Sequence, residues 1–118
     1  MPRVNIPVNT VDRTFFRTNA AEVTGDAAND HVMINDGYTF LEVRNTNAAN
    51  RTFDVHVDGN VDDIPLTEIR TYTVNGTGVG TAIGKTGIFP RELYGETLLI
   101  DVATADLRFT AYTTLRGI

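Results

Sequence analysis

Short stretches of alternating apolar and polar residues recur along the chain, and this period of two is typical of half-buried β-strands. The clearest case is 52–57, where Phe53, Val55 and Val57 alternate with polar neighbours. The other strands that the pattern predicts are 31–34, 38–44, 66–74, 96–102 and 107–115. No segment holds a helical period over ten residues, so one helical turn at 91–95 is the most helix expected. The chain is therefore predicted to be all-β.

Turn sequences separate these strands. An Asn-Asp-Gly turn at 35–37 precedes 38–44, and a small-residue turn follows it, so we expect 38–44 and 52–57 to form an antiparallel pair. Farther along, Ile69 and Tyr72 are the expected core anchors of their strand. Turn signals every 8–12 residues are typical of a sandwich or barrel. We predict a single antiparallel β-sandwich of the jelly-roll or immunoglobulin-like type.

The beginning of the chain differs from the rest. Residues 1–17 are expected to be extended, because two prolines disfavour helix while apolar and polar residues alternate. The following stretch, 18–30, is small and polar and is expected to be a loop. We therefore divide the chain into an extended N-terminal arm and loop, 1–30, and a β-sandwich domain, 31–118.

The predicted arm carries residues suited to a protein interface. Alternation with prolines allows an edge strand but not a central one, the paired phenylalanines are interface anchors, and the arginines can pair with carboxylates. The expected partner-binding residues are Arg3, Val4, Ile6, Val8, Arg13, Phe15, Phe16 and Arg17. The alternative is that this segment forms the first strand of its own sandwich.

Composition narrows the functional classes. A chain of 118 residues is one domain's worth. It has no cysteine, which excludes disulfides and cysteine-based metal sites or nucleophiles. A net charge of −5 opposes nonspecific binding of nucleic acid, which depends on neutralising phosphates. No apolar run has the length of a signal peptide or of a membrane span, so we expect no membrane association.

The glycine-rich run 75–87 contains the most tempting motif, Gly84-Lys85-Thr86. A phosphate-binding loop needs a glycine five residues before that Gly-Lys pair, and Val79 stands there instead. It also needs a following helix whose N-terminal amides hold the phosphate, but a proline-containing corner follows. We expect a flexible or bulged hairpin and no nucleotide or other cofactor.

Other polar clusters also lack a complete site. The acidic loop from Asp58 to Asp63 could hold a hard cation, but the spacing of a calcium loop is missing, so no metal is expected. His56 shares a strand face with Asp54 and could pair with it. Because the chain has no serine and no cysteine, few nucleophiles remain, and we predict that it is not an enzyme.

A run of residues in the middle of the chain resembles a pattern in small head proteins of tailed bacteriophages. The run is Asn-Asp-Gly-Tyr-Thr-Phe-Leu-Glu-Val-Arg-Asn-Thr at 35–46, followed by Arg-Thr-Phe-Asp-Val-His-Val at 51–57. The Gly-Ile-Phe-Pro corner at 87–90 and the closing strand 107–115 are similar to the same pattern. The resemblance covers roughly 31–118, and the glycine-rich insert at 75–84 departs from it.

What the resemblance implies is a β-sandwich that decorates or cements a phage capsid. The expected partners are the major capsid protein and further copies of the chain, and the expected location is the capsid surface of the virion after synthesis in the host cytoplasm. It carries over no catalytic residues. Three alternatives stay open: a head–tail connector or tail subunit, a carbohydrate-binding β-sandwich, and an enzyme.

Overall fold

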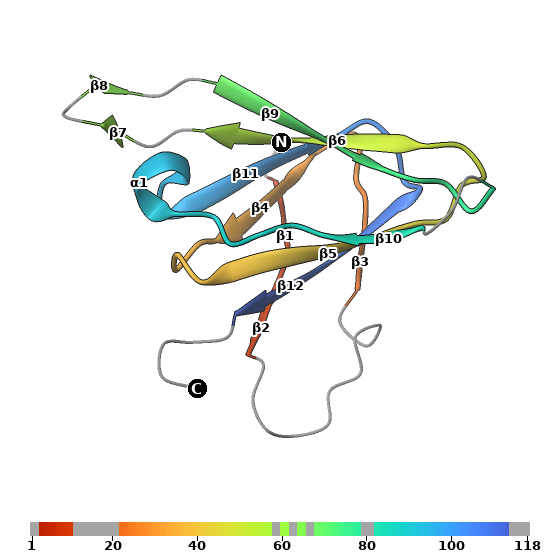
Figure 1. Cartoon of the computed structure of the whole chain (residues 1–118), viewed down its shortest axis with the longest axis horizontal. Coiled ribbons are helices and arrows are strands. Elements are labelled where there is room, and N and C mark those ends of the chain that lie inside the picture. The colour runs from red at the N-terminus through yellow and green to blue at the C-terminus, as the bar shows by residue number, and fades with distance from the viewer. Residues whose placement is uncertain are drawn as a thin grey trace.

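The computed structural model describes residues 3–10, 22–57, 60–61, 64–65, 68–78 and 82–113, which form two five-stranded sheets (Figure 1). Sheet A has the order β1 (Val4–Asn5), β4 (His31–Ile34), β11 (Thr97–Val102), β6 (Arg51–Val57) and β9 (Glu68–Val74). Sheet B has the order β10 (Ile83–Lys85), β5 (Thr39–Asn45), β12 (Leu107–Thr113) and β2 (Val8–Thr10), and β3 (Val23–Thr24) also pairs with β12. A small third sheet joins β7 (Asn60–Val61) and β8 (Ile64–Pro65).

The all-β prediction is confirmed. Among the described residues the only helix is α1 (Arg91–Tyr94), at the position of the predicted helical turn. No helix there is long and apolar enough to cross a membrane. The antiparallel-only prediction is wrong, because β1 pairs with β4, and β2 with β12, in parallel. Both sheets are therefore mixed.

The predicted pairing of β5 with β6 is also wrong. β5 pairs with β12 and β10 in sheet B, whereas β6 pairs with β11 and β9 in sheet A. A hairpin would place the apolar faces of both strands on one side of one sheet. Crossing between sheets instead lets Val43 of β5 and Phe53 of β6 enter one core from opposite sides. The buried Asn45 fixes this crossing by donating hydrogen bonds to the carbonyls of Ala49 and Val74.

The core lies between the two sheets. Phe53 of sheet A meets Phe109 of sheet B edge-on, with ring centroids 5.4 Å apart. Completely or almost completely buried apolar side chains surround this contact: Ile6, Met33, Leu41, Val43, Val55, Leu98, Ile100 and Leu107. Each such side chain contributes about 1.5–3 kcal/mol by leaving water. Thr39, Leu41 and Val43 share the buried face of β5, as the alternation predicts.

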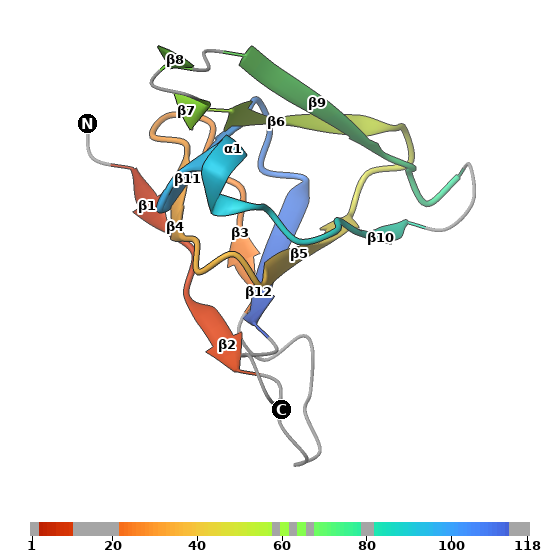
Figure 2. The same cartoon turned by 60° about the vertical axis from the view of Figure 1, so that its left-hand side comes forward.

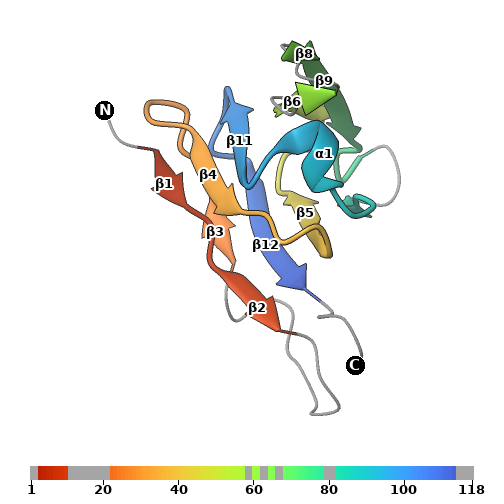
Figure 3. The same cartoon turned by 90° about the vertical axis from the view of Figure 1, so that its left-hand side faces the viewer.

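The N-terminal segment belongs to both sheets. Figures 2 and 3 show β1 beside β4 and β2 beside β12. Between these two strands, the amide of Ile6 donates to the carbonyl of Val32 at 2.9 Å, and the Ile6 side chain is completely buried. Pro7 follows where the chain steps from sheet A to sheet B, a place where its missing N–H leaves no ladder bond unmade.

This placement corrects the predicted arm for residues 3–10, which are the chain's own edge strands. The alternative, that this segment pairs within the chain's own sheets, describes these residues. The physical reason is the side chain of Ile6. Buried in the core between the sheets, it contributes more to the free energy of folding than it would on an extended arm exposed to water. A domain boundary at residue 30 therefore does not separate 3–10 from the rest.

The glycine-rich run does not form the expected hairpin, because β9 lies in sheet A and β10 in sheet B. Its first part packs on the turn after β5. The amide of Gly76 donates to Asn50 Oδ1, and that of Thr77 to the carbonyl of Asn47. A Cβ at position 76 would lie 2.3 Å from the carbonyl oxygen of Ala48, so this close approach requires glycine.

Candidate functional site

A polar cluster ties the N-terminal strand to the outer face of sheet A. Arg3 Nη1 lies 2.7 Å from Asp101 Oδ1, and Asp101 Oδ2 lies 2.7 Å from His56 Nε2. The same Arg3 nitrogen donates to the carbonyls of His31 and Ile100 at 3.0 and 3.2 Å. Burial raises the pKa of Asp101, but the hydrogen bond to His56 and the contact with Arg3 outweigh this, so that pKa lies below its usual value.

The predicted pairing of His56 with Asp54 is therefore wrong. Asp54 instead accepts a hydrogen bond from the Thr71 hydroxyl at 2.7 Å. Residues two apart on one strand share a face, but partners on neighbouring strands come closer. Both carboxylates thus take partners from the strands beside them.

The second histidine anchors the same segment from inside. His31 is completely buried, and its Nδ1 lies 3.2 Å from the Val4 carbonyl while its Nε2 accepts from the Asp26 amide at 2.9 Å. The imidazole is thus neutral, with its proton on Nδ1. Burial lowers the pKa of His31, opposed by the hydrogen bond to Val4. His31 therefore contacts the N-terminal strand directly, whereas His56 is linked to Arg3 only through Asp101.

Arg3 and His56 each lie against one carboxylate oxygen of Asp101, and the chain has no serine or cysteine that could serve as a nucleophile beside them. In the part of the chain that the structure describes, no group of three or more side chains of the metal-binding types could hold an ion. Of the acidic loop, only Asn60 and Val61 are described, as strand β7. The prediction that no cation binds in this loop concerns residues that lie mostly outside the described ones.

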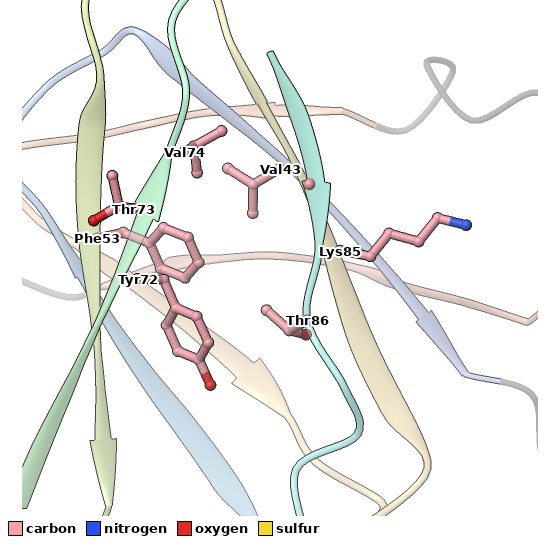
Figure 4. Close-up of a pocket in the computed structure, with 8 residues that line it drawn as sticks. Val43, Phe53, Tyr72, Thr73, Val74, Lys85 and Thr86 are labelled. Atoms are coloured by element: carbon pink, nitrogen blue, oxygen red, sulfur yellow. The ribbon is translucent and has the colours of Figure 1, made fainter. Parts of the chain in front are cut away.

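A small pocket opens where the edges of the two sheets approach each other (Figure 4). Its walls are apolar side chains of β5, β6 and β9, chiefly Val43, Phe53, Tyr72 and Val74, and the β10 edge closes it. Its volume of about 60 Å³ is far below the roughly 300 Å³ at which ligand pockets begin. Lys85 points away from it (Figure 4).

The Gly-Lys-Thr motif has a structural role at this place. Gly84 and Lys85 lie in strand β10, and no helix follows until Arg91. The Thr86 hydroxyl accepts from the Leu41 amide at 3.0 Å and donates to the Gly87 carbonyl at 2.9 Å. The hydroxyl that would serve a magnesium ion in a phosphate-binding loop therefore binds backbone instead.

A groove of about 420 Å³ lies beside the edge of sheet A. We call it the β9–α1 groove; its lining residues are Val57, Glu68, Ile69, Arg70, Leu93 and Tyr94. Ile69 is 57% exposed and Leu93 is 41% exposed. Arg70 lies 5.3 Å from the Tyr72 ring centroid and 3.4 Å from the Tyr94 hydroxyl. Burial, and after it the neighbouring Tyr94, raises the pKa of Tyr72 to about 12, so this phenol stays neutral at physiological pH.

Sequence reasoning missed this groove because it assigned Ile69 to the core. Residues three apart on a strand point to opposite faces, so Ile69 and Tyr72 cannot both be inward. Tyr72 stacks on Phe53 with ring centroids 5.1 Å apart, which leaves Ile69 outside. Strand alternation alone could have shown that Ile69 is exposed, because Tyr72 and Val74 share the inward face of β9.

The predicted partner-binding residues divide into two groups. Arg3, Val4, Ile6 and Val8 bind the chain's own sheets, through the contacts described above. The other four, Arg13, Phe15, Phe16 and Arg17, lie outside the described residues. Comparisons with protein-family models, with curated proteins and with solved structures found no match to this chain.

Proposed function

We propose that this chain is a structural protein of a virion, which decorates or cements the outer surface of a tailed-phage head through protein–protein contacts. The observation that supports binding over catalysis is the number of large apolar side chains that it exposes. Ile34 is 71% exposed, Ile88 is 53% exposed, and Tyr38 is 38% exposed. Exposed apolar surface is typical of protein-binding sites.

Two of these side chains, Ile34 and Ile88, belong to segments that one buried residue connects. Asn35 Nδ2 donates to the carbonyls of Phe89 and Gly95 at 2.9 and 3.0 Å. Asn35 directly follows Ile34, and Phe89 directly follows Ile88. These segments meet where β4 ends and α1 lies (Figure 1). A rigid end of this kind suits attachment to a lattice, and we propose that it faces the shell.

The assignment to a phage head rests on the sequence resemblance across 31–118. With it goes the proposed fold type, a jelly-roll or immunoglobulin-like sandwich, and the proposed partner, the major capsid protein. Electron microscopy of virions tests it. Density for the chain repeated over the head lattice supports decoration, density at one vertex or on the tail supports a connector or tail subunit, and its absence from virions overturns both.

Cosedimentation with empty shells tests the proposed attachment surface. Ile34→Asp should weaken shell binding at least about tenfold, because it places a charge in an apolar contact. Ile83→Asp is the matched control: Ile83 is 49% exposed but lies on β10, away from this end. Equal binding by both variants would exclude this end as the contact surface.

A further inference from the structure

The turn between β3 and β4 holds the N-terminal strand. Within this turn, the amide of Asp30 donates to the carbonyl of Asp26 at 2.8 Å. Asp30 also binds two strands: its carbonyl accepts from the amide of Val4 at 2.9 Å, and its Oδ1 accepts from the amide of Val102 at 2.9 Å. We call residues 26–30 the clasp, because they join the N-terminal strand to β11.

His31 closes the clasp from inside. Its side chain is completely buried, and its ring centroid lies 5.4 Å from that of Phe109. Its Nε2 accepts from the Asp26 amide and its Nδ1 lies against the Val4 carbonyl, so one ring contacts both the clasp and the strand that the clasp holds. A protonated imidazole has an N–H on both nitrogens and accepts no hydrogen bond. Protonation therefore places an Nε2–H against the N–H of Asp26.

Charged groups act on the His31 ring from the clasp and from the N-terminal segment. Burial is the largest influence and lowers the pKa of His31, and Arg3 acts in the same direction, whereas the carboxylates of Asp26 and Asp30 oppose it. Arg3 Nη1 donates to the carbonyl of His31 itself at 3.0 Å, so protonation adds a second positive charge beside the guanidinium. The titratable groups of the other strands nearby lie on the outer faces of the sheets: Asp101 of β11, His56 of β6 and Arg108 of β12.

We propose that His31 is an acid-sensitive latch, whose protonation opens the clasp and releases residues 3–6 from sheet A while the rest of the sandwich stays folded. This segment has the least pairing in the sheet, since β1 and β4 share a register of two residues, whereas β6 and β9 share seven. Asp30 has a φ of 60°, which residues other than glycine rarely adopt, so opening also relieves this conformation. Release leaves the edge of β4 unpaired.

The direction of the pH dependence follows from the two forms of the latch. In the closed form the His31 ring is buried and its pKa is lowered, whereas in the open form the ring reaches water and titrates at about 6.5. Opening therefore takes up one proton below about pH 6.5. The equilibrium constant for opening should be flat above that pH and rise about tenfold for each pH unit below it, until the lowered pKa of the closed form is reached. The buried side chain of Ile6 keeps the open form a minor one at neutral pH.

Native-state hydrogen exchange of the purified chain measures this opening. The Ile6 amide, which donates to the Val32 carbonyl, reports release of the segment, and the Val55 amide in the interior strand β6 reports global unfolding. From about pH 7.5 to about pH 5, the opening constant at Ile6, corrected for the intrinsic exchange rate, should follow the course given above. It should exceed that at Val55 at least about tenfold and depend little on urea, because a local opening exposes little surface. Since no shell is present, the result is independent of the proposed shell binding.

Two substitutions identify the group that titrates. His56→Gln removes the other histidine of the chain and should keep the pH dependence at Ile6, whereas His31→Gln should abolish it. Circular dichroism establishes whether each variant is folded, and the wild-type chain and His56→Gln decide the proposal without His31→Gln. Three results would each overturn it: an opening constant at Ile6 that is the same at both ends of the pH range, equal exchange and equal urea dependence at Ile6 and Val55, or a pH dependence that is lost in His56→Gln.

Discussion

The completely buried side chain of Ile6 offers the most direct test of the fold. Ile6→Ala removes three carbon atoms from the core between the sheets. At about 0.8 kcal/mol for each buried methylene, the lost transfer energy is about 2.4 kcal/mol. The cavity left behind raises this, and measured costs for such substitutions range from about 2 to 5 kcal/mol. We expect Ile6→Ala to lower the free energy of unfolding by about 3–4 kcal/mol.

Urea unfolding followed by far-ultraviolet circular dichroism measures this loss. At about 4 °C for each kcal/mol in a domain of this size, the melting temperature should fall by about 12–16 °C. Ile34→Ala is the matched control, because it makes the same chemical change at a side chain that is 71% exposed. It should cost less than about 0.5 kcal/mol. A loss below about 1 kcal/mol for Ile6→Ala would refute the placement of this segment in the core and restore the arm.

Three further predictions follow from the described contacts. Gly76→Ala should lower the free energy of unfolding by about 2 kcal/mol or more, because its Cβ would meet backbone atoms of Ala48, whereas Gly84→Ala, with nothing within 4 Å, should be nearly neutral in the same urea assay. Burial lowers the pKa of His31, so as the pH falls the unfolded chain binds a proton at this ring before the folded chain does. The contribution of His31 to stability should therefore be complete above about pH 6.5 and decrease below it. A nuclear magnetic resonance titration of the His31 ring with a midpoint at or above about 6.5 would contradict the lowered pKa. Calorimetric titration with ATP and Mg²⁺ should show no binding heat, because residues 84–86 lie on a strand and its continuation, and micromolar affinity would disprove this.

Strand positions were predictable because alternation is local. Phe53 and Val55 reveal the buried face of β6 from six residues of sequence, and the structure places them in the core. Pairing partners were not predictable in this way. β5 and β6 are neighbours in sequence, yet the strand that pairs along the whole of β5 is β12, more than sixty residues away. Local patterns do not record such choices.

The same limit applies to the candidate sites. The partner of His56 is Asp101, 45 residues away, and no spacing rule points to it. Ile6 is buried between two sheets that are formed mostly by later residues, so the first ten residues alone do not predict its burial. By contrast, the exposure of Ile69 follows from strand periodicity, because Tyr72 lies on the inward face of β9 and Ile69 must lie on the other.

The position of β12 bears on when the chain can fold during its synthesis. This last described strand stands at the centre of sheet B, between β5 on one side and β2 and β3 on the other. Until a ribosome has released the residues up to Thr113, β2 lacks the strand that it pairs with and β5 lacks the strand that pairs along its whole length. β11, in the middle of sheet A, is also complete only once Val102 has been released. Nearly the whole chain must therefore emerge before a stable nucleus exists. Such long-range pairing folds slowly and leaves strand edges exposed until β12 is available.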